Sequence, residues 1–283
     1  MLRTRLWMGA CLIALAAAML LADRANGPWY PFLFLFFAVV GVGATVEMHR
    51  LLPAQTRPPL WALLVSVLAL LTGNWLSHVG YAALGSPLEI MLGFFAAGVI
   101  GFFLLEIALY RAPGASVNRI ALGVWFLAYL GVLPAFLTQL RWPRETDDPS
   151  FDRGAMALAL AIFIPKFCDI GAYFTGKFLG RHPMTPLLSP KKTREGFLGG
   201  LAVAALATVI VNLIVPMFRG TAAAIGFGLT VGLAGIFGDL AESLIKRDSH
   251  QKDASSAVPG FGGVLDVIDS IIFAAPVAYW WLR

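Results

Sequence analysis

The sequence predicts an all-α polytopic integral membrane protein. Three observations lead to this prediction: the composition, the length of the apolar stretches and the shortness of the segments between them. Hydrophobic residues make up 59% of the 283 residues and charged residues 13%, with a mean hydropathy of +0.78. Water-soluble domains are usually close to half apolar. The composition therefore excludes a water-soluble globular protein.

About nine transmembrane helices are expected, because each apolar stretch is close to the length of about 20 residues that crosses hydrocarbon as a helix. The first stretch follows Arg3 and Arg5 and resembles a signal peptide, but it is long and another stretch follows at once, which favours an uncleaved anchor. In chain order the stretches are residues 6–22, 29–48, 60–80, 89–109, 119–139, 154–175, 196–216, 221–245 and 264–282.

The basic residues predict the orientation, because Lys and Arg are retained on the cytoplasmic side of a membrane. With the N-terminus inside, the cytoplasmic segments hold fourteen of the 21 bases and the outer segments six, while Lys166 falls within a span. The outer loop 141–153 also carries acids at Glu145, Asp147, Asp148 and Asp152. We therefore expect a cytoplasmic N-terminus and an outside C-terminus, in a bacterial-type inner membrane with the active site facing the cytoplasm.

The chain divides by character into an N-terminal region, 1–150, of structural lipid-facing helices, and a C-terminal catalytic region, 151–283, with cytoplasmic loops at 176–195 and 246–263. In the first region Glu47 and Glu106 are interpreted as snorkelling or structurally hydrogen-bonded helix-end residues. The bases are scattered among loops, which argues against nucleic acid and favours anionic membrane lipids and phosphorylated substrates. The two cysteines lie in apolar spans and indicate neither a disulfide nor a zinc site.

Acidic residues are concentrated near the end of the chain. Helical spacing places Asp239, Glu242, Ser243 and Lys246 on one face of a helix, and the pair Asp266–Asp269 likewise shares a face. Hard oxygen ligands from two helices suit Mg²⁺ or another divalent cation that also binds substrate phosphates. The competing interpretation is salt bridging within the membrane, for example between Glu242 and Lys246, which we expect to leave at least two carboxylates without partners.

Two polar loops accompany these acids. The loop 248–263 ends in glycines, which let the backbone approach a ligand closely. The free N–H groups at the start of the following helix are expected to donate hydrogen bonds to a phosphate. The loop 176–196 carries five bases beside Ser189 and Thr193, which suits a triphosphate or a lipid phosphate as well as ordinary topology. Asp169 is either a further metal ligand or a structural partner of Lys166.

The motifs in these regions resemble those of the phosphatidate cytidylyltransferase, or CDP-diacylglycerol synthase, family. One part of the resemblance lies in 243–247, 252–253 and 259–269, and the other in 169–174 and 189–196. The resemblance implies transfer of the cytidylyl group of CTP to phosphatidate, which gives CDP-diacylglycerol and pyrophosphate. Membrane lipids and a homodimer are further expected partners.

The resemblance also implies residue roles. Asp239, Asp266 and Asp269 are the expected metal ligands, with Glu242 as an outer ligand, and Lys246 joins the three aspartates as a catalytic residue. The residues expected to contact the nucleotide or its phosphates are Ser189, Lys191, Lys192, Arg194, Ser243, Arg247, Lys252, Asp253, Gly262 and Gly263.

The chain departs from the family pattern at two positions, with Phe261 in place of His and Val267 in place of Arg. These departures leave open an inactive paralogue or a changed substrate. A CTP-dependent kinase of polyprenol or another lipid alcohol is a second alternative, and it would need a base to activate the hydroxyl. A cation channel or transporter that uses the acids as its ion path is the non-enzymatic alternative.

Overall fold

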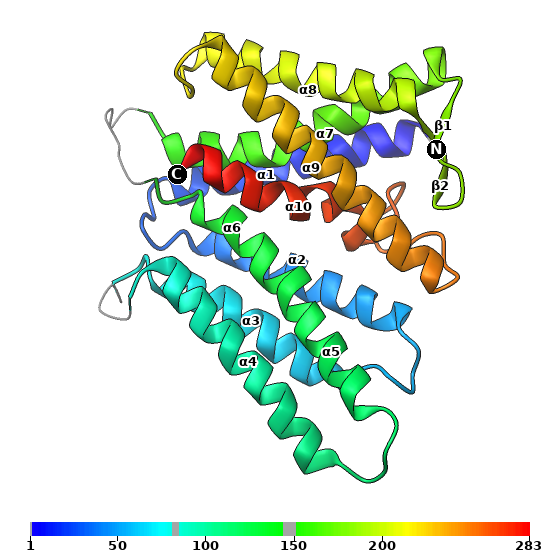
Figure 1. Cartoon of the computed structure of the whole chain (residues 1–283). Coiled ribbons are helices and arrows are strands. Elements are labelled where there is room, and N and C mark those ends of the chain that lie inside the picture. Colours follow the sequence, from blue (N-terminus) through cyan, green and yellow to red (C-terminus); the bar gives the residue numbers. More distant parts are fainter. Residues whose placement is uncertain (1, 81–84, 144–150) are drawn as a thin grey trace. The chain divides into compact units, whose positions relative to one another are not determined.

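The computed structural model describes residues 2–80, 85–143 and 151–283 (Figure 1). The expected outer-loop acids Glu145, Asp147 and Asp148 lie outside these ranges. The helices are α1 (Leu2–Asp23), α2 (Pro31–Leu51), α3 (Leu60–Leu76), α4 (Pro87–Leu109), α5 (Ser116–Phe126), α6 (Leu133–Gln139), α7 (Arg153–Leu179), α8 (Arg194–Ile214), α9 (Thr221–Asp248) and α10 (Val264–Leu282), with a π-helical segment, η2 (Leu127–Val132), between α5 and α6.

Seven helical segments of the described ranges are long and apolar enough to cross a membrane. They are α2, α4, the continuous segment from α5 to α6, α7, α8, α9 and α10, whereas α3 and the apolar part of α1 are shorter. The chain is therefore an all-α polytopic integral membrane protein. The count of nine spans and the orientation of the chain remain predictions.

The expected span 119–139 lies in one continuous helical segment, in which the π-helical η2 joins α5 to α6 just before Pro134. Pro134 has no N–H to donate to the preceding turn, and its ring would clash with the carbonyl four residues earlier. A π-helical turn relieves this conflict by shifting the bonding to a wider spacing. The Leu133 N–H accordingly donates to the Ala128 carbonyl.

The chain forms two compact units whose boundary differs from residue 150. The first unit contains residues 1–135 and 253–267, and the second contains 136–252 and 268–283. The glycine loop thus belongs to the first unit and most of the acids to the second. The functional division into a structural and a catalytic region stays a prediction.

In the first unit, α2, α3, α4 and α5 pack against one another and bury Leu63, Leu70 and Phe126. A bidentate ion pair joins two of these helices, because Arg119 of α5 donates from Nε and Nη2 to the Glu106 carboxylate of α4, at 2.7 Å each. Glu106 is 4% exposed. Of the two interpretations of Glu106, the structural hydrogen bond is confirmed.

In the second unit, α9 approaches its neighbours closely through glycines. A Cβ on Gly228 would lie 2.7 Å from the Ala204 carbonyl oxygen of α8, and one on Gly235 would lie 2.7 Å from Pro165 of α7. A Cβ on Gly238 would collide with the Asp269 carbonyl oxygen of α10. Small residues allow such close packing of membrane helices. The glycine at 238 therefore lets α9 bring the next residue, Asp239, beside α10.

The basic loop forms a short hairpin, which the all-α prediction did not include. Strands β1 (Pro183–Thr185) and β2 (Ser189–Thr193) pair antiparallel, with Pro183 opposite Thr193 and Thr185 opposite Ser189. The hairpin leads directly into α8, whose first turn is capped by Thr193, since the Thr193 Oγ1 accepts a bond from the Gly196 N–H at 3.1 Å. The bases of this loop are thus held in an ordered element.

Candidate functional site

Three acids of the second unit meet between α9 and α10. Asp239, Glu242 and Asp269 each offer a carboxylate oxygen, and the three oxygens lie within 4.8 Å of one another. Glu242 is 1% exposed and Asp269 8% exposed. The spacing of three residues puts Asp239 and Glu242 on one face of α9, as the sequence predicts, and the contact of α9 with α10 adds Asp269. We call these three residues the acid cluster.

Each carboxylate of the acid cluster has a lysine partner. The Nζ of Lys192 in β2 lies 2.7 Å from Asp239, and the Nζ of Lys246 lies 2.7 Å from Glu242, one turn away on α9. The Nζ of Lys166 in α7 donates to Asp269 at 3.1 Å. The expectation that salt bridging would leave at least two carboxylates unpartnered is therefore wrong. The lysines come from three different elements, and helical spacing reveals only the pair within α9.

Lys166 has a second acid beside it. Its Nζ lies 3.6 Å from Asp169, which also accepts a hydrogen bond from the Ser270 Oγ at 3.0 Å. Asp169 is thus a structural partner of Lys166, one of the two roles considered for it. The sequence linked Lys166 only with Asp169 and did not predict its pairing with Asp269. The signal was nonetheless present, because a lysine inside an apolar span is costly and usually marks a paired or functional site.

A cavity of about 530 Å³ lies beside this network. Asp239 and Lys192 line it together with Lys191 of the hairpin, Asp169 and Tyr173 of α7. Its volume falls within the range of about 300–1,000 Å³ that is typical of small-molecule sites. The cavity thus opens beside both a carboxylate of the acid cluster and the cations of the hairpin.

The structure brings some of the expected nucleotide contacts to this cavity and not others. Lys191 and Lys192 line it, whereas Ser189 starts the same strand and Arg194 starts α8 without lining the cavity. Arg194 is exposed. Two of these four residues therefore line the cavity.

The remaining expected contacts of the second unit lie along the end of α9. Ser243 is half-buried and follows Glu242, while the Arg247 guanidinium donates to the Gln251 carbonyl oxygen at 3.1 Å and to the Leu188 carbonyl oxygen at 3.4 Å. Arg247 thus ties the turn of the hairpin to α9. Lys252 is exposed in the following loop, and so is Asp253, which already belongs to the first unit.

Asp266 is engaged in the first unit. Its Oδ2 accepts hydrogen bonds from the N–H groups of Gly263, at 2.6 Å, and Ala254, at 3.0 Å. Asp266 therefore closes the glycine loop, although it is only three residues from Asp269 on α10. Its assignment as a metal ligand stays a prediction.

The N–H groups at the start of α10 are occupied by Glu47 of α2. Its carboxylate accepts bonds from the Val264 and Leu265 N–H groups at 2.9 and 2.8 Å, and from the Ser255 Oγ at 2.6 Å. An internal carboxylate thus takes the position next to the helix N-terminus that an external anion would favour. The expectation of free N–H groups there is wrong, whereas the structural hydrogen bond considered for Glu47 is confirmed.

Two glycines of this loop, Gly262 and Gly263, allow the backbone to turn and to approach the Glu47 carboxylate. Gly262 has a φ of +111°, which disfavours a side chain, and it exchanges backbone hydrogen bonds with Val258. A Cβ on Gly263 would collide with the Glu47 carboxylate. Glycine is needed here for the turn and for this internal contact. The expected nucleotide contacts at Gly262 and Gly263 stay predictions.

The arrangement combines two chemical capacities in one unit. Clustered carboxylate oxygens suit a hard divalent cation, and ammonium groups beside a cavity suit phosphate oxygens. With Asp169 included, four carboxylates face three lysines, which leaves one negative charge. The charges of the network therefore nearly balance.

Comparison with known proteins gives relatives for the whole chain. A model described as "Cytidylyltransferase family" matches residues 3–283. Proteins named phosphatidate cytidylyltransferase are similar to it: one from Helicobacter pylori is 31% identical over 96% of this chain and 89% of its own length. One from Haemophilus influenzae is 31% identical over 93% of both chains, and one from Synechocystis is 34% identical over 65% of this chain and 68% of its own. The chain belongs to the cytidylyltransferase family.

Proposed function

We propose that this chain transfers the cytidylyl group of CTP to phosphatidate, which gives CDP-diacylglycerol and pyrophosphate in phospholipid biosynthesis. The observation that carries the proposal is the cavity in which Lys191 and Lys192 stand beside Asp239 of the acid cluster. The names of the relatives support the choice of substrates.

The reaction needs positioning more than acid–base chemistry. An oxygen of the phosphatidate phosphate is already anionic at neutral pH, so it attacks the α-phosphorus of CTP without a general base. A bond forms between that oxygen and the α-phosphorus, and the bond from the α-phosphorus to the pyrophosphate oxygen breaks. Lys191 and Lys192 bind the triphosphate and hold it in line for this displacement. Arg194, Ser189, Ser243, Arg247, Lys252, Asp253, Gly262 and Gly263 are proposed further contacts of the nucleotide.

The acid cluster fits a divalent cation such as Mg²⁺. Its three carboxylate oxygens lie within 4.8 Å of one another, close enough to share one ion, and all are hard donors. A cation held by Asp239, Glu242 and Asp269 would stabilise charge on the transferred phosphoryl oxygens and on the leaving pyrophosphate. Asp266 is proposed as a further ligand, and its Oδ2 also accepts hydrogen bonds from the Gly263 and Ala254 N–H groups.

The lysines have proposed roles in the same scheme. Lys192 is paired with Asp239 while it lines the cavity, so its ammonium group can exchange this carboxylate for a phosphate oxygen. Lys246 is paired with Glu242, which is more buried than Asp269, and we assign to Lys246 the task of holding the Glu242 carboxylate in place. Lys166 does the same for Asp269.

The cellular setting follows from the substrates and the charge distribution. CTP is soluble and phosphatidate is a membrane lipid, so the site must reach the membrane surface from the aqueous side. The excess of bases in the hairpin and the neighbouring loops supports a cytoplasmic face, a cytoplasmic N-terminus and an inner (plasma) membrane location. A homodimer is also part of the proposal.

Labelled CTP tests the function. The purified chain in mixed micelles with phosphatidate and Mg²⁺ is expected to transfer label from α-labelled CTP to lipid, and none from γ-labelled CTP. Transfer of γ-label would indicate a lipid kinase instead. Asp239→Asn is expected to abolish transfer, whereas Asp248→Asn, an exposed acid at the end of the same helix, serves as the matched control. Absence of label in lipid with the unaltered chain would overturn the proposal and favour an inactive relative, for which Phe261 and Val267 are the candidate causes.

A further inference from the structure

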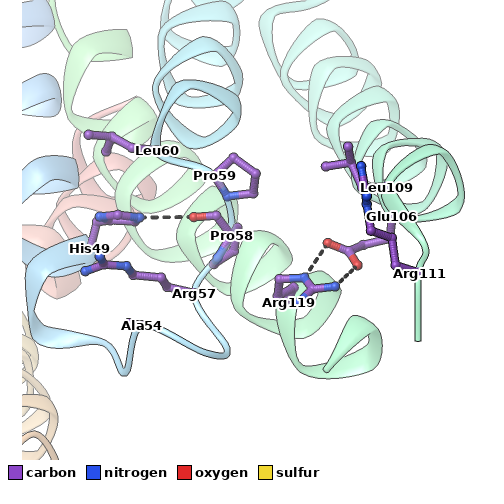
Figure 2. Close-up of a pocket in the computed structure, with 10 residues that line it drawn as sticks. All are labelled: His49, Ala54, Arg57, Pro58, Pro59, Leu60, Glu106, Leu109, Arg111 and Arg119. Atoms are coloured by element: carbon purple, nitrogen blue, oxygen red, sulfur yellow. Dashed lines mark hydrogen bonds and ion pairs between the residues drawn. The ribbon is translucent and has the colours of Figure 1, made fainter. Parts of the chain in front are cut away.

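A second basic cavity lies in the first unit and shares no residue with the proposed catalytic site. It has a volume of about 510 Å³ and lies where the ends of α2 and α4 meet the start of α5 (Figure 2). Three arginines line it, namely Arg57, Arg111 and Arg119, and Glu106 is its acid. Three guanidinium groups and one carboxylate leave two positive charges. We call this cavity the arginine pocket.

The cations of the arginine pocket differ in what they are bonded to. Arg119 is held by Glu106 through two hydrogen bonds of 2.7 Å, which Figure 2 shows as dashed lines. For Arg57 and Arg111, no hydrogen bond or ion pair of the guanidinium occurs among the residues that the structure describes. Arg57 is half-buried nonetheless. Their fork-shaped donors therefore stand ready for an anion with several oxygens.

The loop that carries Arg57 is tied to α2. The Nε2 of His49 lies 3.0 Å from the Pro58 carbonyl oxygen, and because a carbonyl can only accept, Nε2 is the donor (Figure 2). Pro58 and Pro59 follow Arg57 directly and restrict the backbone. This segment is thus held against α2 instead of moving as a free loop, which lowers the entropic cost of binding a ligand.

Part of the wall of the arginine pocket is apolar. Leu60, at the start of α3, and Leu109, at the end of α4, line it beside the cations. Both residues lie at ends of apolar helices, where lipid phosphate groups are found. The positive-inside rule alone accounts for basic loops but requires neither a cavity nor a fixed loop beside them.

We infer that the arginine pocket binds a phosphate-bearing anion through Arg57 and Arg111, with Arg119 as a fixed third cation. A lipid headgroup phosphate and a free polyphosphate share this chemistry. In either case the two guanidinium groups donate to phosphate oxygens, and Glu106 prevents Arg119 from turning away. Bidentate arginine–phosphate contacts are among the stronger charge-assisted hydrogen bonds.

Hydrogen exchange in nanodiscs tests this inference without nucleotide. The full chain is placed in phosphatidylcholine discs, in phosphatidylcholine discs with added pyrophosphate, and in discs that contain phosphatidylglycerol. Slower exchange is expected in segments 53–60 and 110–119 with at least one probe. Protection by the lipid alone identifies a headgroup site, and protection by pyrophosphate alone identifies a site for soluble polyphosphate. No protection with either probe overturns the inference.

Two double variants complete the test. In Arg57→Gln/Arg111→Gln we expect binding of the effective probe to weaken about tenfold or more, because each lost contact is a hydrogen bond to a charged group. Arg50→Gln/Arg219→Gln removes the same charge from two exposed arginines that do not line the arginine pocket, and it should keep the protection. Equal protection in both variants would overturn the inference. The melting temperature without probe shows whether each variant is folded, and cytidylyl transfer, measured separately, reports on the proposed function alone.

Discussion

The acid cluster and the arginine pocket use opposite charge arrangements. In the acid cluster every carboxylate has a lysine within 3.1 Å. In the arginine pocket, Arg119 is paired with Glu106, whereas Arg57 and Arg111 have no ion-pair partner in the part of the chain that the structure describes. Lysine is a point charge on a flexible stem, and arginine is a rigid fork. Paired lysines therefore suit a site whose ionic partners are exchanged during a reaction, whereas unpaired arginines suit a site that holds an anion in place.

The largest effect is expected at the acid cluster. Asp269→Asn removes the charge that pairs with Lys166 and one proposed ligand, so we expect lipid labelling from α-labelled CTP to fall by about 10²–10³-fold. Rates are measured at saturating phosphatidate, with Asp248→Asn as the control. Turnover at the level of the unaltered chain would show that the acid cluster has no part in the reaction.

The second prediction concerns the contribution of Glu47 to the stability of the first unit. Glu47→Gln replaces a buried carboxylate that accepts three hydrogen bonds, two of them at a helix N-terminus, so we expect a loss of about 2 kcal/mol in the free energy of unfolding. Chemical denaturation in detergent measures it. Glu89→Gln is the matched control, because Glu89 also bonds at a helix start, in the capping box of α4, but is exposed. A greater loss in the control would contradict the role given to Glu47.

The third prediction tests whether the cation beside Asp239 must be a lysine or can be an arginine. Lys192→Arg keeps the charge beside Asp239 but replaces a compact ammonium by a larger planar group, and we expect about tenfold slower cytidylyl transfer. The rate constant and the KM for CTP are measured together. If Lys192→Arg matches the unaltered chain, the positive charge alone matters and the proposed exchange of partners is not needed.

The smallest effect is expected when an arginine of the arginine pocket is replaced by lysine. Arg119→Lys loses the bidentate contact with Glu106, but the pair is partly exposed, with 25% of the Arg119 side chain accessible. We expect a loss of about 0.5 kcal/mol in stability. Thermal unfolding of the two chains in the same detergent measures the difference, and an effect larger than that of Glu47→Gln would be the contrary result.

Sequence reasoning succeeded where the pattern is local. The apolar stretches located the helices to within a few residues, and helical spacing placed Asp239, Glu242 and Lys246 on one face of α9. It failed where the partner is distant in the chain. Lys166 meets Asp269 across 103 residues and Glu47 meets Val264 across 217, and no periodicity encodes such contacts. Loop 176–196 was recognised by its charge, but its strands are short and strongly polar, so no apolar alternation marked them.

The start of α10 at Val264 is a second place where the sequence did not reveal a distant partner. Glycines ahead of a helix are typical of an anion site, and the inference from the sequence was sound as chemistry. The anion turned out to be Glu47, part of the protein itself. Only the three-dimensional contact distinguishes an internal carboxylate from an external phosphate.

Gly238 is expected to tolerate no larger residue, although it takes no part in the chemistry. Glycine brings neither a charge nor a side-chain hydrogen-bond donor to this position, yet one added methyl group would strike the backbone of α10 at Asp269. An alanine there would push apart the two helices whose acids must meet. A scan of tolerated substitutions would therefore find a strictly forbidden position next to Asp239 where no chemistry takes place, and a ranking of residues by chemical reactivity alone would overlook it.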